Sequence, residues 1–306
     1  MRIATILEPH GAGRAVAEAA TKRGHEIVLL DSGVTSPHPD VGYFRTCTNE
    51  KWKARMLAGI AGMQAIGVPT LPSFENAKLY DDKAAQMAPL GPWLPRTSFI
   101  TSDTEAAELA PHMSYPFVSK SREGAQSRNV RLIETPSQAA KEIQSAFGPS
   151  GIQLSIGSQR GYLLWQEFVE GNPHDIRVIR CGQHLFGLKR YNREHVPFAS
   201  GSGKREPITT LDDPNTRLAF ASAVDITEHV GTRWACFDFV FRAGRALCLE
   251  ISFSWVEKAY DDCPCFDCDS LAPNGLTAAS WAEFAVDELE RLASRLEPAL
   301  HAPLVA

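Results

Sequence analysis

Two apolar segments that each carry one acid follow each other in Trp234-Ala-Cys-Phe-Asp-Phe-Val-Phe-Arg-Ala-Gly-Arg-Ala-Leu-Cys-Leu-Glu-Ile-Ser-Phe253. This pattern predicts two β-strands folded back on each other around Ala243-Gly244. The acids are Asp238 and Glu250. A carboxylate on a half-buried strand is costly to ionise unless a cation meets it, and two close carboxylates raise each other's pKa. Because a bound metal ion removes both costs, the pair indicates a metal site. The alternative is an ordinary hairpin with two solvent-facing acids.

The spacing of the two acids tests this idea. Side chains alternate between faces along a strand, and cross-strand partners share a face. Asp238 and Glu250 are twelve residues apart, so they oppose each other only if the hairpin is centred on Gly244. We therefore expect a loop of odd length with Gly244 at its middle, at a position suited to a positive φ. A two-residue Ala-Gly turn would put the acids on opposite faces. Ser252 should share the face of Glu250.

Length and composition limit the class of protein. A chain of 306 residues suggests two or three domains of roughly 100–200 residues each. The net charge of −5 and the lack of a basic stripe argue against a nucleic-acid partner. The first ten residues predict a short strand rather than a signal peptide, and no apolar run is long enough to span a membrane. We expect a cytoplasmic protein whose seven cysteines are reduced thiols.

The first segment predicts a βαβ unit, with strands near 2–7 and 26–30 and a helix at 14–22. Between the first strand and the helix lies Gly11-Ala-Gly13. A nicotinamide-binding loop is one interpretation, but the third glycine of that pattern falls on Val16. We favour a helix start whose backbone N–H groups receive a substrate carboxylate.

Further periodic segments follow along the chain. We expect helices near residues 51–66, 76–87, 103–110, 137–147, 213–230 and 276–296. Strands are expected near residues 96–100, 115–120, 129–133, 162–170, 172–180 and 184–190. The polar loop 121–129 has the composition of a flexible flap, and Lys120 before it can deliver a charge to a phosphate. A merely solvated strand-end lysine is the alternative. The last two strands carry Asp175 and three cations, Arg177, Lys189 and Arg190. The embedded cations suggest an anionic ligand.

The order of these features resembles the ATP-grasp superfamily over roughly residues 76–258. It is most similar to the carboxylate–amine ligases related to ribosomal-protein glutamate ligase, glutathione synthetase and D-alanine–D-alanine ligase. The resemblance implies an α/β (α+β) chain with the ATP-grasp fold. An N-terminal α/β domain at 1–92 would precede a central subdomain with the phosphate flap at 93–165. A C-terminal subdomain with the metal site would span 166–306, and the two subdomains would clasp the nucleotide.

The resemblance also implies a role for each matching residue. Contacts to ATP phosphates come from two lysines and the tip of the flap, which are Lys83, Lys120, Gln126 and Ser127. The hinge that meets adenine, with a nearby acid for the ribose, corresponds to Gln166, Glu167, Phe168, Val169 and Glu170. Cations near the transferred phosphate correspond to Arg177, Lys189 and Arg190, of which the two arginines act on the reacting groups. The metal ligands correspond to Asp238, Glu250 and Ser252.

Two features depart from the family pattern. The last metal motif of the family is usually Glu-x-Asn, whereas this chain has Glu250-Ile-Ser252, and a hydroxyl is shorter than an amide. The flap has one glycine, Gly124, where relatives often have several. Beyond the hairpin, Cys263, Cys265 and Cys268 offer three thiols for zinc, yet no second C-x-x-C pair follows. A reduced loop beside the substrate pocket is the other interpretation.

The reaction implied by the resemblance is an ATP- and Mg²⁺-dependent ligation. A carboxylate of a small amino-acid-like substrate becomes an acyl-phosphate, and an amine then attacks it to form an amide or peptide bond. The amine belongs to a second molecule or to the same one. Mn²⁺ is the alternative ion, and we expect a homodimer. Two other functions remain open: a nucleotide-binding protein without ligase activity, favoured by Ser252, and an ATP-dependent phosphotransferase.

Overall fold

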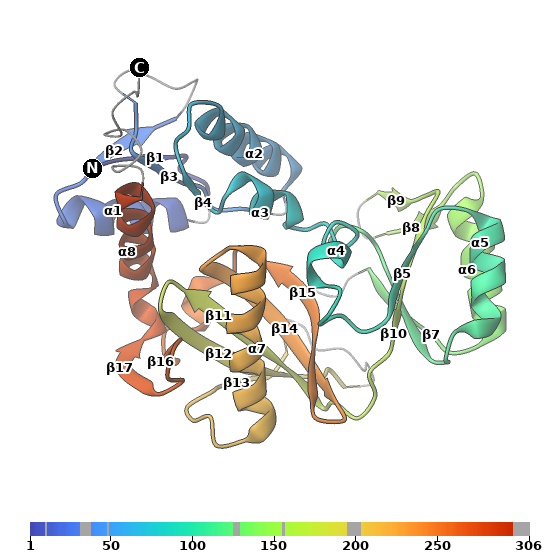
Figure 1. Cartoon of the computed structure of the whole chain (residues 1–306). Coiled ribbons are helices and arrows are strands. Elements are labelled where there is room, and N and C mark those ends of the chain that lie inside the picture. Colours follow the sequence, from blue (N-terminus) through green and yellow to red (C-terminus); the bar gives the residue numbers. More distant parts are fainter. Residues whose placement is uncertain are drawn as a thin grey trace, which may run out of the picture.

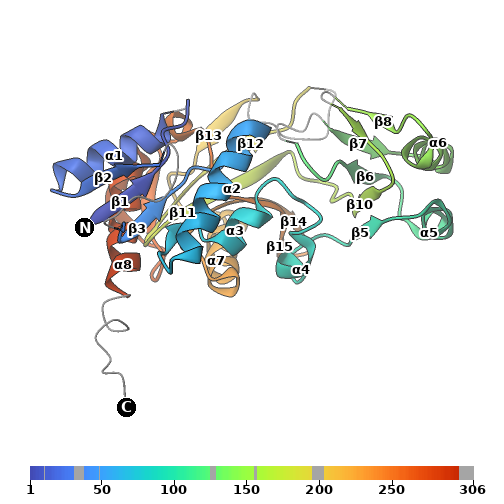
Figure 2. The ribbon, with the colours of Figure 1, turned by 90° about the horizontal axis from the view of Figure 1, so that it is seen from above.

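The structure is a computed structural model, and it describes residues 1–9, 11–30, 38–47, 49–124, 129–154, 157–194 and 203–295. These residues form three units, each built on its own main sheet (Figure 1). We call them the first unit (residues 1–79), the middle unit (97–167) and the last unit (174–295). The middle unit lies at one end of the molecule, away from α1 and α8 in both views (Figure 2).

The first unit has a parallel sheet in the order β2-β1-β3-β4. Its strands are β1 (Arg2–Thr5), β2 (Glu26–Leu29), β3 (Val41–Tyr43) and β4 (Thr70–Leu71). Its helices are α1 (Ala12–Lys22), α2 (Glu50–Ala65) and α3 (Phe74–Leu79). Successive residues of β1 face opposite sides of the sheet. Ile3 belongs to the core on the side of α1, and Ala4 belongs to the core on the side of α2. The predicted βαβ opening is confirmed.

We had expected the start of α1 to receive a substrate carboxylate. This expectation is wrong, because a side chain of the protein already occupies the position. The backbone N–H groups of Gly11 and Gly13 donate to the carboxylate of Glu8 over 3.1 and 3.0 Å. Glu8 is buried, and a carboxylate at a helix N-terminus is favourable for the helix dipole. The Gly11-Ala-Gly13 turn is therefore a structural cap.

The middle unit has an antiparallel sheet in the order β5-β10-β6-β7. Its strands are β5 (Thr97–Ile100), β6 (Phe117–Lys120), β7 (Val130–Ile133) and β10 (Leu163–Glu167), with a small hairpin of β8 (Ile152–Gln153) and β9 (Ser158–Gln159). One face packs against α5 (Asp103–Leu109) and α6 (Pro136–Phe147). Thr135 and Gln138 form a capping box at the start of α6, as the local sequence favours.

The last unit has one large antiparallel sheet in the order β15-β14-β11-β12-β16-β17, and β13 also pairs with β12. Its strands are β11 (His174–Cys181), β12 (His184–Tyr191), β13 (Arg205–Pro207), β14 (Trp234–Arg242), β15 (Arg245–Ser252), β16 (Pro264–Asp267) and β17 (Pro273–Thr277). Helix α7 (Pro214–Val230) covers one face. Helix α8 (Trp281–Ser294) lies on the other face beside α1, so a shared core joins the last unit to the first (Figure 1).

Two predicted helices differ from the structure. The helix expected at 76–87 ends at Leu79, and a separate short helix α4 (Met87–Leu90) follows. Asp81 between them has a positive φ of 55°, which cannot continue a right-handed helix. The helix expected at 276–296 begins only at Trp281, because Pro273–Thr277 pairs with β16 as strand β17.

The hairpin of β14 and β15 differs from the expected one in its loop. Arg242 pairs with Arg245, so the connection is a two-residue turn in which Ala243 and Gly244 have φ values of 48° and 72°. Two positive φ values are the geometry that follows the natural twist of a hairpin. The expectation of an odd-length loop is therefore wrong, although the positive φ at Gly244 is confirmed. Asp238 still pairs with Glu250, because the register shifts by one residue at Leu249.

Candidate active site

Four charged side chains from three neighbouring strands form a buried network. Arg177 on β11 lies directly across from Asp238 on β14 and donates to it twice, over 2.6 and 2.8 Å. Arg190 on β12 reaches the same carboxylate over 2.7 Å and also donates to Asp175 over 2.7 Å. Cross-strand pairing therefore brings both predicted arginines to one predicted metal ligand.

The pKa values of the two carboxylates in this network shift in opposite directions. Burial raises the pKa of Asp175, and the charge of Arg190 offsets part of that rise. Burial would also raise the pKa of Asp238, but Arg177 and Arg190 together hold it far below its usual range. Asp238 is therefore a permanent anion at neutral pH.

Lys120 ends strand β6 and points into the same site. Its ammonium group donates to the side-chain oxygen of Gln166 over 2.6 Å, and Gln166 donates onward to Thr97 over 2.9 Å. Burial lowers the pKa of Lys120 to about 8, although the nearby charge of Glu250 offsets part of the shift. The residue is 8% exposed, so the alternative of a solvated strand-end lysine is wrong.

Lys83 connects the hairpin of the last unit with the stem of the predicted flap. Its ammonium nitrogen lies 3.5 Å from a carboxylate oxygen of Glu250 and donates to the carbonyl of Gly124 over 2.9 Å. The stem is held by two acids that precede the lysine. Gly124 donates its N–H to Asp81 over 2.7 Å, and Arg122 donates to Asp82 over 2.8 Å.

Glu250 and Ser252 share the face of Asp238, as predicted, since Glu250 pairs with Asp238 and Ser252 pairs with Cys236. The side chain of Glu250 is 29% exposed. The hydroxyl of Ser252 donates to the carbonyl of Ser254 over 2.9 Å. The N–H of Ser254 donates back to this hydroxyl oxygen over 3.4 Å. The proton and one lone pair of Ser252 are therefore engaged, and one lone pair remains for a ligand.

An apolar cluster adjoins these polar groups. The bulge places Leu249 with Val240, Leu247 and Val169, whereas Cys248 and Ile251 on either side belong to the core beneath α7. Two successive residues of β15, Leu249 and Glu250, thus face the site. Val169 was predicted for the hinge, but the other three were not singled out in the sequence, although strand alternation places Val240 on the face of Asp238 and Leu247 pairs with Val240.

Other predicted residues lie around or away from this centre. Glu167 forms an ion pair with Arg242, and Glu170 is exposed just beyond β10, after Phe168. Lys189 pairs with Ile176, whose side chain faces α7, so the strand alternation takes Lys189 away from Arg190. Gln126 and Ser127 fall outside the described residues.

Gln86 was not singled out in the sequence, yet it holds the metal-site strand. Its side-chain amide donates to the carbonyl of Ile251 over 3.0 Å and accepts from the N–H of Ile251 over 3.2 Å. The residue is 2% exposed. At Ile251, which lies between Glu250 and Ser252, the side chain of Gln86 therefore supplies the hydrogen bonds that a neighbouring strand would supply.

The cysteines do not support a zinc site. All seven are free thiols and buried, as predicted. Cys263 and Cys265 belong to the core shared with the first unit, whereas Cys268 belongs to the core beneath α7. No group of three or more His, Cys, Asp or Glu side chains in the described part of the chain is arranged to hold a metal ion.

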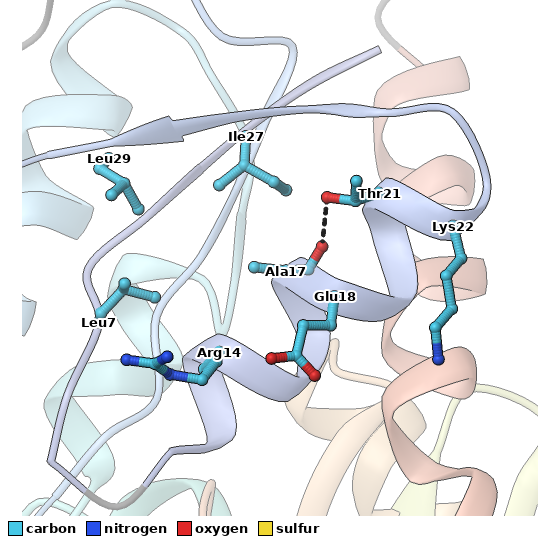
Figure 3. A pocket seen from close by; sticks show the side chains of 8 residues that line it. All are labelled: Leu7, Arg14, Ala17, Glu18, Thr21, Lys22, Ile27 and Leu29. Atoms are coloured by element: carbon cyan, nitrogen blue, oxygen red, sulfur yellow. Dashed lines mark hydrogen bonds between the residues drawn. The ribbon is translucent and has the colours of Figure 1, made fainter.

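A separate pocket lies in the first unit, beside α1 and β2 (Figure 3). Aliphatic side chains such as Leu7, Ile27 and Leu29 line it, together with the charged ends of Arg14 and Glu18. Leu29 is 49% exposed. This pocket contains none of the predicted site residues, and we do not assign it to the same chemistry.

No family model matches the sequence. Several solved structures have a similar fold. A RimK domain ATP-grasp protein from Sphaerobacter thermophilus has a TM-score of 0.59 and 17% identity, covering 95% of this chain and 100% of the other. D-alanine–D-alanine ligase from Bacillus anthracis has a TM-score of 0.62 and 12% identity, covering 98% of this chain and 99% of the other. The ATP-grasp ligase PsnB, solved with a minimal precursor, Mg and ADP, has a TM-score of 0.60 and 16% identity, covering 95% of this chain and 97% of the other.

The chain has the ATP-grasp fold. The fold predicted from the ordered motifs is thereby confirmed. Curated relatives of this ATP-grasp protein include a probable alpha-L-glutamate ligase from Cellvibrio japonicus, 26% identical over 264 residues that make up 79% of this chain and 83% of the relative. Another, from Haemophilus influenzae, is 24% identical over 269 residues, or 78% and 83%. The names of both relatives agree with the predicted class of enzyme, a ligase.

No helix among the described residues of this ATP-grasp protein is long and apolar enough to cross a membrane.

Proposed function

We propose that this ATP-grasp protein is a carboxylate–amine ligase that binds ATP over the β14–β15 hairpin. One observation carries the proposal: lysines from two separate parts of the chain, Lys83 and Lys120, converge on the hairpin that presents Asp238 and Glu250. Cations and carboxylates arranged around one centre suit a metal–triphosphate complex.

The two lysines would hold the phosphates. Lys83 now donates to the carbonyl of Gly124, a neutral acceptor that a phosphate oxygen can replace. Lys120 has a pKa of about 8, so it is mostly charged at pH 7, and a bound phosphate would raise that pKa further. The flap that includes Gln126 and Ser127 would cover the same phosphates.

Asp238 and Glu250 suit Mg²⁺, which prefers one or two carboxylates with phosphate oxygens and waters. Each carboxylate oxygen can accept two hydrogen bonds. From the described part of the chain, one oxygen of Asp238 accepts a single bond, from Arg177 Nε, which leaves a lone pair for a metal. Glu250 keeps partial exposure. Bound together with ATP, the ion would neutralise charge on the phosphates; Mn²⁺ is the alternative, and Ser252 is a third candidate ligand.

Arg177 and Arg190 would stabilise the transferred phosphoryl group and the substrate carboxylate. Both guanidinium groups are paired with Asp238, so a phosphate or acyl-phosphate would share them with that carboxylate. Their positions are fixed by strand pairing, which suits a transition state whose charge must be met without rearrangement. Lys189 would contribute only at longer range.

The hinge Gln166 to Val169 would meet the adenine ring. The side chain of Gln166 is engaged with Lys120, so we propose that backbone groups of the hinge bond the base. Val240, Leu247 and Leu249 offer an apolar surface beside Val169 for the flat ring. Glu167 or Glu170 would accept the ribose hydroxyls.

The reaction we propose joins a carboxylate to an amine with loss of water. The carboxylate attacks the γ-phosphorus of ATP and releases ADP; the amine nitrogen then attacks the acyl carbon, phosphate leaves, and a proton is lost from nitrogen. The names of the relatives make glutamate the first amine to test.

Glu250→Gln tests this function. We expect the variant to lose substrate-dependent release of ADP while its circular dichroism spectrum is unchanged, and Glu283→Gln on the exposed face of α8 serves as control. Mass spectrometry should find ADP, phosphate and a product lighter by one water than its substrates. Wild-type turnover of Glu250→Gln would refute the proposed role of the hairpin.

A second candidate is a nucleotide-binding protein without ligase activity. The hydrogen bond from Ser252 to Ser254 favours it, because that hydroxyl replaces the usual asparagine of the family. Such a protein would bind ATP with Mg²⁺ and leave it intact across a screen of amino acids. A phosphotransferase would instead yield ADP and a stable phosphorylated product.

The remaining features of the proposal concern the whole chain. We propose domains at 1–92, 93–165 and 166–306. The boundary between the second and third domains falls inside β10 (Leu163–Glu167). A cytoplasmic location and a homodimer stay predictions. Sedimentation equilibrium of the purified chain tests the dimer.

A further inference from the structure

A second charged pocket lies far along strand β11 from the residues that face the candidate active site. It has a volume of about 440 Å³ and is bordered by the end of α7, the turn between β11 and β12, the start of β14 and the end of α8. Four arginines line it: Arg180, Arg233, Arg291 and Arg295. Arg180 is three positions after Arg177, an odd number, so the strand alternation directs them to opposite faces of the sheet.

Arg180 forms the fixed inner wall of this pocket. It is 4% exposed, and its guanidinium donates to the carbonyl of Gly182 over 3.1 Å and to the hydroxyl of Thr227 over 2.5 Å. Both acceptors are neutral. The positive charge of Arg180 is therefore buried without a direct carboxylate partner among the described residues.

Arg233 and Arg291 share one buried acid. Arg291 forms a two-fold ion pair with Glu288, whose side chain is 3% exposed. Arg233 Nε lies 3.6 Å from Glu288, beyond hydrogen-bond distance, and within the described ranges this nitrogen has no hydrogen-bond partner. Arg291 Nη1 likewise has none there. These two nitrogens are buried, whereas the side chains of Arg233 and Arg291 as a whole are 26% and 24% exposed and line the pocket.

The cations repel one another. Burial lowers the pKa of Arg233 despite the pull of Glu288, and the charges of Arg291 and Arg180 lower it further. The carbonyl end of α7 nearby favours cations, which explains why arginines are tolerated here. The helix end supplies no partner for Arg233 Nε or Arg291 Nη1 among the described residues, and buried donors without partners are costly.

We propose that this pocket binds a phosphate group, either inorganic phosphate or the phosphomonoester of a small metabolite. Guanidinium groups hold phosphate oxygens in paired hydrogen bonds, and a dianion would occupy the N–H groups of Arg233, Arg291 and Arg295 together. Glu228 and Asp269 also line the pocket, and they limit the excess of positive charge to what a single small anion can neutralise. A polyanion such as a nucleic acid does not suit a chain of net charge −5.

Calorimetric titration of the full chain tests this pocket. The probes are inorganic phosphate, glycerol 3-phosphate and, as a carboxylate, acetate. Each titration is carried out with and without a saturating non-hydrolysable ATP analogue and Mg²⁺, because the candidate active site could also hold phosphate. We expect a phosphate site that persists with the analogue present and does not bind acetate comparably.

Single substitutions locate the binding. Arg233→Gln should weaken phosphate binding by about tenfold, as expected for loss of a charge-assisted contact. Glu288→Gln should strengthen it, because it removes the anion that competes for Arg233 and Arg291. Arg217→Gln removes an exposed charge from α7 outside the pocket and should change nothing. Arg291→Gln is less suitable, since it leaves buried Glu288 without its main partner.

The results separate the sources of the phosphate. Binding of glycerol 3-phosphate at least as tight as that of inorganic phosphate identifies a phosphomonoester site, and the reverse identifies an inorganic phosphate site. The proposal is overturned if phosphate does not bind, if the ATP analogue displaces it, or if Arg233→Gln and Arg217→Gln behave alike.

Discussion

Asp238 and Glu250 oppose each other across β14 and β15 although a two-residue turn joins these strands. Without a register shift, Leu249 would stand opposite Asp238, and Glu250 would face the core beneath α7. The bulge at Leu249 turns Glu250 toward the site, while Leu249 stays with the apolar residues on the same face. One extra residue therefore assembles a carboxylate pair beside an apolar side chain.

The bulge leads to a prediction about nucleotide affinity. Leu249→Ala removes apolar surface beside Val169 without touching a charged group. We expect the KM for ATP to rise by about tenfold, the effect of losing up to ~1.4 kcal/mol of apolar contact, with kcat nearly unchanged. Leu29→Ala, at a side chain that is 49% exposed in the first unit, is the control. Equal kinetics for the two variants would exclude Leu249 from the nucleotide pocket.

Asp238 and Glu250 should differ in their effect on stability. Asp238→Asn leaves Arg177 and Arg190 buried beside a neutral group, which should lower the free energy of unfolding by about 3–5 kcal/mol. Glu250 is 29% exposed and has only a 3.5 Å contact with Lys83, so Glu250→Gln should cost less than about 1 kcal/mol. Urea unfolding of both variants measures the difference. Equal losses would contradict the assignment of the network around Asp238.

The lowered pKa of Lys120 predicts that the affinity for ATP depends on pH. Its pKa of about 8 in the folded chain lies below the ordinary value of 10.5, so it loses its proton as the pH rises through 8. Above pH 8, each further pH unit lowers the charged fraction by about tenfold, and the affinity for ATP should fall with it. Lys120→Met should abolish this dependence, whereas Lys22→Met on α1 should retain it. Measured dissociation constants for ATP between pH 7 and 10 distinguish these outcomes.

The lowered pKa of Lys120 also affects stability, but stability should rise with pH where the affinity for ATP falls. Between pH 8 and 10.5 the unfolded chain holds the Lys120 proton while the folded chain has released it. The free energy of unfolding contributed by this group therefore rises with pH across that window. Urea titrations of the wild type and Lys120→Met at pH 8 and 10 should show a rise that only the wild type has.

The sequence predicted those parts of the site that depend on local patterns. Strand alternation correctly placed Glu250 and Ser252 on one face. The embedded arginines of β11 and β12 do lie together in the charged network, whereas the anionic ligand that they suggested stays a prediction. Lys120 could be singled out because it ends an apolar strand. The expected opposition of Asp238 and Glu250 is confirmed, but the reason given for it was wrong, because a bulge rather than an odd loop corrects the register.

Contacts between distant segments could not be predicted. Gln86 and Ile251 are 165 residues apart in the chain, and no periodicity in either segment indicates that a side-chain amide bonds that strand. The same holds for Asp81 and Gly124, which are 43 residues apart. Glu8 could have been recognised as a cap, since an acid precedes the helix start, but the glycine pattern suggested a ligand instead.

Ser252 provides the last prediction, since it decides whether the metal site is complete. Its hydroxyl donates to Ser254, so Ser252→Ala should change the Mg²⁺ requirement little. Ser252→Asn supplies a longer side chain with a carbonyl oxygen, which suits Mg²⁺, and should lower the Mg²⁺ concentration for half-maximal ATP binding by about tenfold. Calorimetry of ATP binding at increasing Mg²⁺ measures both variants without requiring turnover. If Ser252→Ala instead raises the Mg²⁺ requirement strongly, the serine hydroxyl is itself a ligand, and the site is complete as it stands.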